Sequence, residues 1–344
     1  MSRVNLVYYP ANADSGVVAG ARIARWLAKT LRNVIFVDAK NVREVAKTLP
    51  ASYVLYIVNV PKPMVGHVEA AEVLIEQADK LVWIQNDYAI QTPTPTTNGQ
   101  SIFTRAFTKR TKFKRGHGMW VWTTCEDRVR HIPSMARYVN WNCIAIEPTL
   151  EIVKPENPKF VYWGAYRPGR LESFRRYFGT GEDHIDYEQE VEELAEMWTI
   201  SATPNGADKF LASTSLTQHN FVRPIVVPHD LQKYAGAVYI EDDMSHRRYH
   251  SPANRFYEAL AAGIPLLIDH LAAGTIKKAG YEVPDAYVSR TFGDVQTFMA
   301  NSPAVRRKIA LKQREIWAVE PDSGLPLMDA LKKRIRHLEK ECLS

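Results

Sequence analysis

The chain has 344 residues, more than a single domain usually holds, and this length predicts two domains. Hydrophobic residues make up 46% of the chain and charged residues 24%, which is typical of a soluble globular protein and excludes a fibrous or disordered one. No apolar run is long enough to cross a membrane, and the three cysteines lack metal-ligand spacing, so we expect free thiols and a cytoplasmic location.

The first third of the chain alternates between two hydrophobic patterns. Short apolar runs bounded by turn residues predict strands, and apolar residues three and four positions apart predict helices. Strands that alternate with helices indicate βαβ units and a parallel sheet. We expect strands at 4–9, 34–37, 53–60 and 81–84, and helices at 17–31, 42–48 and 68–78.

Residues 92–118 break this rhythm, beginning with a Pro/Thr-rich segment that cannot form a regular element. No Asp or Glu occurs between Tyr88 and Cys125, and phenylalanines interleave with the basic residues there. This composition favours a polyanionic partner and fits a DNA-binding loop, in which cations neutralise phosphates and aromatic rings stack on bases. The alternative is a disordered loop of a mildly basic protein. The basic residues are Arg105, Lys109, Arg110, Lys112, Lys114 and Arg115.

A second α/β region follows a proline-rich segment at 148–158, which we interpret as an interdomain linker. The final helix, at about 325–341, is amphipathic and basic, and we expect it to pack back across the first domain. The predicted domains are therefore residues 1–150, residues 158–322 and a C-terminal helical segment at 323–344. Strands are expected at 160–164, 237–240, 264–268 and 286–288, and helices at 170–178, 188–197, 252–262, 292–300 and 303–317.

One candidate phosphate site follows the strand at 160–164. Ligands bind at the carboxyl ends of strands in open α/β sheets, and Gly164 would let the backbone approach a ligand closely. Arg167 and Arg170 carry forked donors that suit a diphosphate. The alternative is a solvated turn with two surface arginines.

A second candidate is the helix expected from Pro252, capped by Ser251 and ended by Gly263. Its first turn, with Asn254 and Arg255, suits a phosphate because the backbone N–H groups there have no partner in the helix. Glu258, one turn further along, can accept hydrogen bonds from a ribose diol. The alternative is an exposed salt bridge between Arg255 and Glu258.

The segment that leads into this helix contains both acidic and phosphate-binding residue types. An apolar strand ends at Glu241 and Asp243, for which a solvated loop is the expected surrounding. Ser245 and His246 follow, and Ser245, Arg247 or Arg248 can contact a phosphate. No further carboxylate has a spacing that would complete a metal site.

These segments, Gly164-Ala165-Tyr166-Arg167-Pro168-Gly169-Arg170 and Asn254-Arg255-Phe256-Tyr257-Glu258-Ala259-Leu260, resemble the donor-binding domain of GT-B glycosyltransferases. The likeness is strongest to phage enzymes that glycosylate hydroxymethylated pyrimidines in DNA, and it covers residues 160–270 in detail. It implies an α/β fold of two Rossmann-like parallel-sheet domains that face a central cleft. It also implies a location in the host cell cytoplasm.

The same resemblance implies a role for each candidate residue. Arg167 and Arg170 would neutralise the diphosphate of a UDP-sugar as it leaves, Asn254 and Arg255 would add phosphate contacts, and Glu258 would hold the ribose. Further candidates toward the donor are Ser15, Gly16, Ser245 and His246.

Asp87, after the fourth strand, would take the proton from an acceptor hydroxyl, unless it is only a helix cap or turn residue. No tightly bound cofactor and no metal for the chemical step are implied. The expected partner is double-stranded DNA that carries a hydroxymethylated pyrimidine. The protein is expected to be a monomer that does not associate with a membrane.

Two other functions stay open at this point. One is a GT-B glycosyltransferase that acts on a saccharide or small-molecule acceptor, and the other is an α/β protein that binds DNA without catalysis. Many retaining enzymes of this kind carry a second Glu eight residues after the first, and here that position is Leu266. The sequence therefore does not decide between retention and inversion, nor does it identify the sugar or the pyrimidine.

Overall fold

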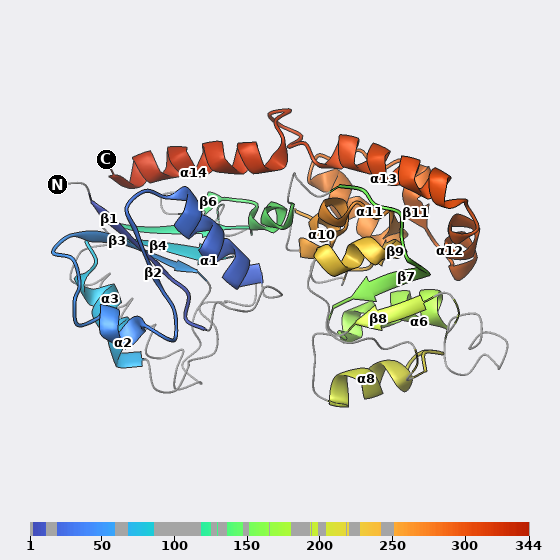
Figure 1. Cartoon of the computed structure of the whole chain (residues 1–344), viewed down its shortest axis with the longest axis horizontal. Coiled ribbons are helices and arrows are strands. Elements are labelled where there is room, and N and C mark those ends of the chain that lie inside the picture. Colours follow the sequence, from blue (N-terminus) through green and yellow to red (C-terminus); the bar gives the residue numbers. More distant parts are fainter. Residues whose placement is uncertain are drawn as a thin grey trace. The chain divides into compact units, whose positions relative to one another are not determined.

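The computed structural model divides the chain into two compact units (Figure 1). Unit 1 comprises Met1–Ile144 and Met328–Ser344, and unit 2 comprises Ala145–Leu327. The structure describes residues 3–11, 19–58, 68–85, 118–124, 129, 136–146, 151–164, 166–179, 193, 195–198, 204–217, 219, 228–241 and 251–343.

Unit 1 is built on a six-stranded parallel sheet with the order β2-β1-β3-β4-β5-β6. The strands are β1 (Val4–Tyr8), β2 (Val34–Val37), β3 (Tyr53–Val58), β4 (Lys80–Gln85), β5 (Met119–Thr123) and β6 (Ala136–Tyr138). The helical elements are α1 (Ala19–Thr30), α2 (Val42–Val45), α3 (Val68–Gln77), the 3-10 turn η1 (Trp141–Ala145) and α14 (Leu327–Leu343). The predicted strands and helices of the first 85 residues are therefore confirmed, with β5 and β6 added at the far edge.

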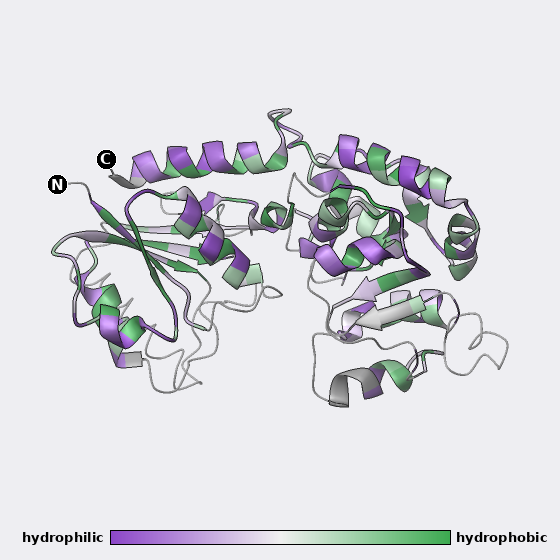
Figure 2. Ribbon diagram, in the orientation of Figure 1, coloured by the Kyte–Doolittle hydropathy of each residue, from purple (hydrophilic) through white to green (hydrophobic). Residues whose placement is uncertain are grey.

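Helices cover both faces of this sheet (Figure 1). Because strand residues alternate between faces, Leu6 and Tyr8 point to the side that carries α2 and α3, where they form one apolar cluster. Val7 points to the opposite side, over which α1 packs. Helix α14 lies on the α1 side as well, since Arg137 of β6 pairs with its Glu341 at 3.2 Å. Figure 2 shows hydrophobic residues along one side of α14 and hydrophilic residues along the other.

Unit 2 contains a five-stranded parallel sheet with the order β11-β10-β9-β7-β8. Aromatic side chains of β7 and α6 fill its core; the rings of Tyr162 and Phe174, for example, meet edge to face with centroids 5.2 Å apart. The strands are β7 (Asn157–Trp163), β8 (Ala195–Trp198), β9 (Tyr234–Tyr239), β10 (Leu266–Asp269) and β11 (Val288–Ser289). The helical elements are η2 (Pro168–Arg170), α6 (Leu171–Phe178), α8 (Pro204–Leu211), η4 (His229–Lys233), α10 (Asn254–Ala262), α11 (His270–Lys278), η5 (Asp285–Tyr287), α12 (Phe292–Met299) and α13 (Pro303–Trp317).

One predicted helix of unit 2 is wrong over residues 195–197. The helix expected at 188–197 overlaps β8, which pairs in parallel with Phe160–Trp163 of β7. Pairing with a buried strand outweighs the helical preference of a short Ala-Glu-Met sequence. Helices α8 and α11 lie where no element was expected. Among the described helices, none combines the length and the apolar character that a membrane span requires.

Candidate functional site

Charged and polar side chains gather at one edge of the unit 2 sheet. Strand β7 ends at Trp163, β9 at Tyr239 and β10 at Asp269, and these ends share an edge because the strands are parallel. Helix α6 follows β7 directly through η2, and α10 packs against both β9 and β10. The carboxyl edge of an open parallel sheet is where ligands bind in α/β proteins.

Glu241, which closely follows β9, is buried between two arginines. Its Oε1 lies 2.5 Å from Nη2 of Arg170 and 2.8 Å from Nη2 of Arg255, and its Oε2 lies 2.9 Å from the same nitrogen of Arg255. The side chains of Glu241 and Arg170 are only 3% and 5% exposed. The expectation of a solvated loop is therefore wrong for Glu241, because its charge is removed from water and compensated by two cations.

Two tyrosine hydroxyls extend this cluster, one at Arg170 and one at Glu241. Arg170 Nη1 donates a hydrogen bond of 3.0 Å to Tyr162, and the Tyr239 hydroxyl donates one of 3.3 Å to Glu241 Oε2. Burial, and then the negative charge of Glu241, raise the pKa of Tyr239, so this hydroxyl stays protonated. Strand ends, η2 and α10 are thus joined in one hydrogen-bonded network.

Arg255 uses only part of its hydrogen-bonding capacity inside the network. Its Nη2 donates to the Ile240 carbonyl at 3.1 Å as well as to Glu241, whereas its Nε is buried and meets no acceptor among the described residues. Burial lowers the pKa of Arg255, but Glu241 and neighbouring acidic groups raise it by more, so the net shift is upward. A charged donor that is only partly satisfied can bind an anionic oxygen strongly.

Gly164 provides the space in which Arg255 sits. It has a φ of +144°, and a Cβ at this position would lie 2.8 Å from Arg255 Nη1 and 3.1 Å from the Tyr162 hydroxyl. A ligand was expected to approach the backbone closely at Gly164. In the structure the group that lies close to this glycine is the Arg255 guanidinium. Any side chain here would strain the backbone and displace the guanidinium.

Helix α10 begins without a side-chain cap. Its N-cap is Ala253, whose N–H donates to the Tyr239 hydroxyl at 2.8 Å, and the helix starts at Asn254. The predicted cap is therefore wrong: Ser251 precedes the N-cap, and its buried hydroxyl finds no partner among the described residues. The predicted end is confirmed, since Gly263 adopts a φ of +69° at the C-cap. An uncapped helix start presents N–H groups and partial positive charge to an anion.

Glu258 lies one turn into α10 and is only 4% exposed. Its Oε2 accepts a hydrogen bond of 2.7 Å from the indole Nε1 of Trp163, at the end of β7. The alternative of an exposed Arg255–Glu258 salt bridge is therefore wrong, because Arg255 pairs with Glu241 and Glu258 with Trp163. The indole fixes this carboxylate close enough to Arg255 for its charge to help raise the pKa of that arginine.

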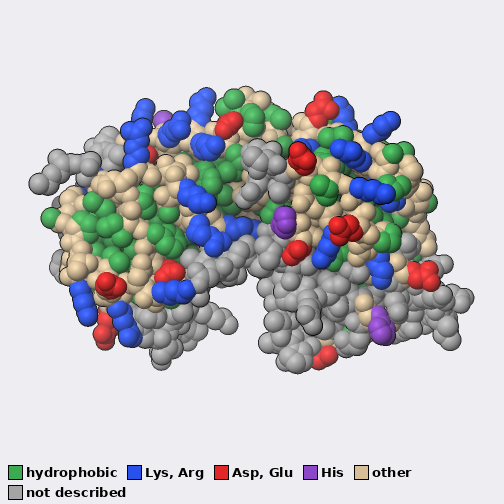
Figure 3. Space-filling model, in the orientation of Figure 1, with side chains coloured by type: hydrophobic (Ala, Val, Ile, Leu, Met, Phe, Trp, Pro, Cys, Tyr) green, Lys and Arg blue, Asp and Glu red, His purple; other side chains and the backbone are tan. Residues whose placement is uncertain are grey.

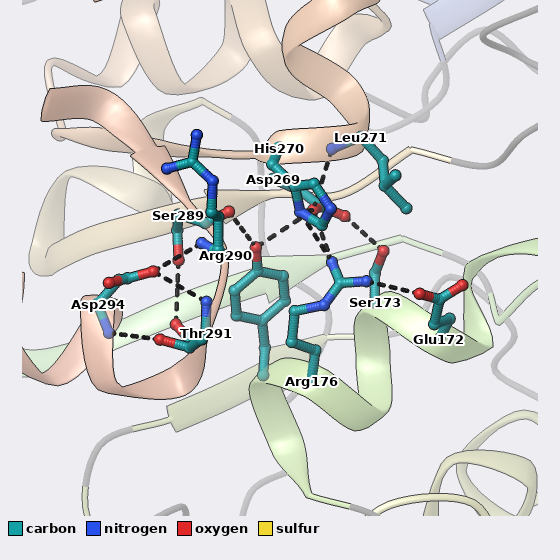
Figure 4. Close-up of polar contacts among 11 residues, drawn as sticks. Glu172, Ser173, Arg176, Asp269, His270, Leu271, Ser289, Arg290, Thr291 and Asp294 are labelled. Carbon is teal, nitrogen blue, oxygen red and sulfur yellow. Dashed lines mark hydrogen bonds and ion pairs between the residues drawn. The ribbon is translucent and has the colours of Figure 1, made fainter. Parts of the chain in front are cut away.

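A second polar network anchors α6 to the neighbouring strand ends (Figure 4). Asp269, fully buried at the end of β10, accepts hydrogen bonds from Ser173 and, at 3.0 Å, from Arg176 Nη1. The Tyr177 hydroxyl donates to the Ser289 carbonyl at 2.8 Å and also lies 3.3 Å from Asp269 Oδ1. Since Arg170 is the N-cap residue of α6, these contacts also position Arg170.

The predicted phosphate-binding residues have different surroundings in the structure. Arg170, Arg255 and Glu258 come together in the buried cluster, Asn254 opens α10 beside them, and Gly164 packs on Arg255. Arg167 is exposed, unlike Arg170, so the expected matched pair of arginines divides into a surface residue and a buried one. Ser15, Gly16, Asp87, Ser245, His246 and the six basic residues from Arg105 to Arg115 lie outside the described residues.

No sequence pattern indicated a positioning role for Glu241, Tyr162, Tyr239 or Trp163. Only the position of Glu241 after an apolar strand hinted at a buried charge, because strand ends at this edge meet neighbouring loops. No group of three or more His, Cys, Asp or Glu side chains within the described parts of the chain is arranged to hold a metal ion.

Comparison with known proteins gives matches at the level of structure alone. No protein-family profile and no curated protein sequence matches the chain. T4 phage BGT in complex with UDP and Mn²⁺ matches over 100% of both chains, with a TM-score of 0.60 and 12% identity. A point mutant of T4 phage BGT in complex with UDP-glucose matches over 99% of both chains, with a TM-score of 0.62 and 11% identity.

An alpha-glucosyltransferase in complex with UDP and DNA containing an HMU base also matches. The similarity covers 97% of this chain and 99% of that one, with a TM-score of 0.54 and 9% identity. At such low identities these likenesses establish the fold. They confirm the expected α/β class, in which two parallel-sheet units follow one another along the chain, and the expected resemblance to phage glucosyltransferases of the GT-B fold.

Proposed function

We propose that the chain is a nucleotide-sugar-dependent glycosyltransferase that moves a sugar from a UDP-sugar to the hydroxymethyl group of a modified pyrimidine in DNA. The observation that carries this proposal is the cluster at the carboxyl edge of the unit 2 sheet. There Arg170 and Arg255 share Glu241, the uncapped start of α10 lies beside them, and Glu258 is fixed by Trp163.

Each part of the cluster suits one part of a nucleoside diphosphate. The first N–H groups of α10 are donors for phosphate oxygens, and the Arg255 guanidinium in the same turn adds positive charge. The Glu258 carboxylate accepts hydrogen bonds from the two hydroxyls of a ribose. Tyr162 and Glu241 hold the arginines in place before the ligand arrives, which lowers the entropic cost of binding.

The same groups account for the chemistry of transfer. The bond between the anomeric carbon and the β-phosphate oxygen breaks as the acceptor hydroxyl bonds to that carbon, through an oxocarbenium-like state. Negative charge grows on the departing diphosphate, where the fixed cations stabilise it; removing one such donor costs about 10²–10³-fold in rate. We assign the role of general base to Asp87, whose carboxylate would take the proton from the acceptor hydroxyl.

Two observations support DNA as the acceptor. An alpha-glucosyltransferase of the same fold has been seen with UDP and DNA containing an HMU base. The segment from Tyr88 to Cys125 has no acidic residue and six basic residues interleaved with phenylalanines, a composition suited to phosphates and bases.

The test is direct detection of the product. Hydroxymethylated DNA is incubated with the protein and a panel of nucleotide sugars, digested to nucleosides and analysed by mass spectrometry. We expect one pyrimidine nucleoside to gain the mass of a single sugar, and unmodified DNA to gain none. Glu258→Ala should raise the KM for the donor. Transfer at wild-type rates by the Glu258→Ala variant would contradict the site, and the absence of transfer from every donor would contradict the function.

A further inference from the structure

Helices α1 and α3, which lie on the two faces of the unit 1 sheet, differ in charge. Helix α1 and the residues up to 32 contain four basic residues and no Asp or Glu, whereas α3 on the other face contains three Glu and no Lys or Arg. A polyanion is therefore attracted to α1 and repelled from α3. The basic residues are Arg22, Arg25, Lys29 and Arg32, and the acidic ones are Glu69, Glu72 and Glu76.

The basic residues of α1 form one stripe along the helix. Arg22, Arg25 and Lys29, spaced by three and four positions, lie on one side of α1, opposite the buried Ile23, Ala24 and Leu27, and Arg32 follows just after the helix ends at Thr30. Lys29 and Arg32 are exposed, and neither forms an ion pair with any residue that the structure describes. From Arg22 to Lys29, at about 1.5 Å per residue, the helical part of the stripe is about 10 Å long, which spans about three phosphates along one strand of B-form DNA.

Helix α14 adds a second basic stripe on the same face. Lys333, Arg336 and Lys340 are exposed at spacings of three and four positions, while Ile335 and Leu338 between them are buried. Figure 3 shows Lys and Arg side chains over α1 and along α14. The charge of this face thus comes from two helices that are separated by most of the sequence.

We propose that this face of unit 1, defined by Arg22, Arg25, Lys29 and Arg32 of the α1 segment, binds the sugar–phosphate backbone of the acceptor duplex away from the reacting base. The inference rests on the proposed function for the identity of the polyanion. It concerns residues other than the basic segment at 103–115. Contacts to phosphates hold a duplex in register without reading its sequence, so this face sets affinity for long duplexes and leaves the chemical step unchanged.

The test compares two double variants of the full-length protein. Lys29→Gln/Arg32→Gln removes two exposed cations from the α1 face, and Arg43→Gln/Lys47→Gln removes two exposed cations in and just after α2 on the opposite face. Both variants change the net charge equally and alter only surface side chains. Affinity for a long unmodified duplex is measured by fluorescence anisotropy over a series of salt concentrations. Sugar transfer is measured on the long hydroxymethylated duplex and on a hydroxymethylated mononucleoside.

We expect the α1 variant to bind the duplex more weakly, with the slope of log affinity against log salt reduced by about 2, since each lost phosphate contact lowers it by about 0.9. Its KM for the long duplex should rise, while kcat and transfer to the mononucleoside stay at wild-type values. The α2 variant should match the wild type in all of these measurements.

Three results would overturn the proposal. The first is an α1 variant with wild-type duplex affinity and salt slope, which would reject the surface while leaving the enzyme's function intact. The second is an equal loss of affinity in both variants, which would show an effect of net charge alone. The third is a wild-type protein that transfers sugar to the mononucleoside yet binds no duplex, which would reject DNA as the partner and keep the donor chemistry.

Discussion

Glu241 gives the sharpest stability prediction because its carboxylate is the only acidic group that joins Arg170 to Arg255 in the described network. Glu241→Gln keeps the size of the side chain but removes its charge, so two cations remain buried with one neutral amide between them. Removing one partner of a buried ion pair costs about 3–5 kcal/mol. Since both pairs share one carboxylate, the costs overlap, and we expect about 4 kcal/mol in total.

Thermal unfolding followed by circular dichroism measures this loss. For a unit of this size each kcal/mol corresponds to about 2–4 °C, so Tm should fall by about 8–16 °C. The matched control is Glu172→Gln on α6, whose pair with Arg176 lies on the surface with the Glu side chain 83% exposed. That pair contributes about 0–1 kcal/mol, so the control should melt close to the wild type.

UDP provides the decisive comparison. In the Glu241→Gln variant the diphosphate supplies the negative charge that the two arginines have lost, so UDP should raise Tm by more degrees than it raises that of the wild type. A Glu241→Gln variant with the same Tm as the wild type would show that the network does not contribute about 4 kcal/mol to the free energy of unfolding. A variant that is destabilised but gains nothing from UDP would show that the arginines do not face the diphosphate.

Three further predictions follow from single contacts, and a fourth concerns metal. Gly164→Ala should lower Tm and weaken UDP binding, because its Cβ would lie 2.8 Å from Arg255 Nη1 at a φ of +144°. The control is Gly274→Ala, which has open space around it in α11 and should be neutral or stabilising by up to about 1 kcal/mol. Thr291→Ala should destabilise α12 by about 1 kcal/mol in urea titrations, since the Thr291 hydroxyl accepts from the N–H of Asp294; an unchanged midpoint would contradict this. Backbone N–H groups hold the pKa of Asp294 below its usual value. The stabilisation that Asp294 provides is therefore complete above the unfolded pKa of about 3.9 and is lost as the pH falls through the lower folded pKa. Asp294→Asn should reduce the pH dependence of the free energy of unfolding in acid. Transfer activity should survive exhaustive chelation by EDTA, and its complete loss with recovery on Mn²⁺ addition would show that cations of the chain do not replace a metal.

The sequence predicted those parts of the donor unit that depend on local patterns. The helix at 254–262, its end at Gly263 and the strand that follows were all visible as apolar periodicity and a left-handed glycine position. Local signals also placed Arg170 just after one strand and Glu258 in the helix that precedes another. Their convergence followed from the rule that parallel strands share one carboxyl edge.

The partners of these residues could not be predicted, because each lies far away in the chain. Glu241 is 71 positions from Arg170, and Glu258 is 95 positions from Trp163. A charged residue after a strand is usually solvated, and only the packing of α6 and α10 on the sheet shows that this one is buried. Ser251 was predicted to cap α10 by its residue type, yet a distant hydroxyl, that of Tyr239, holds the N-cap residue.

The most direct test of the central claim is a calorimetric titration of UDP into the wild-type protein and into Arg255→Lys, with uridine as the reference ligand. The Lys variant keeps the positive charge but loses the forked donors that face the proposed diphosphate. We predict measurable UDP binding by the wild type, about tenfold or more weaker binding by the variant, and equal uridine binding by both. Equal UDP affinity in the two proteins, or no heat of UDP binding in the wild type, would contradict the assignment of this cluster to a nucleoside diphosphate.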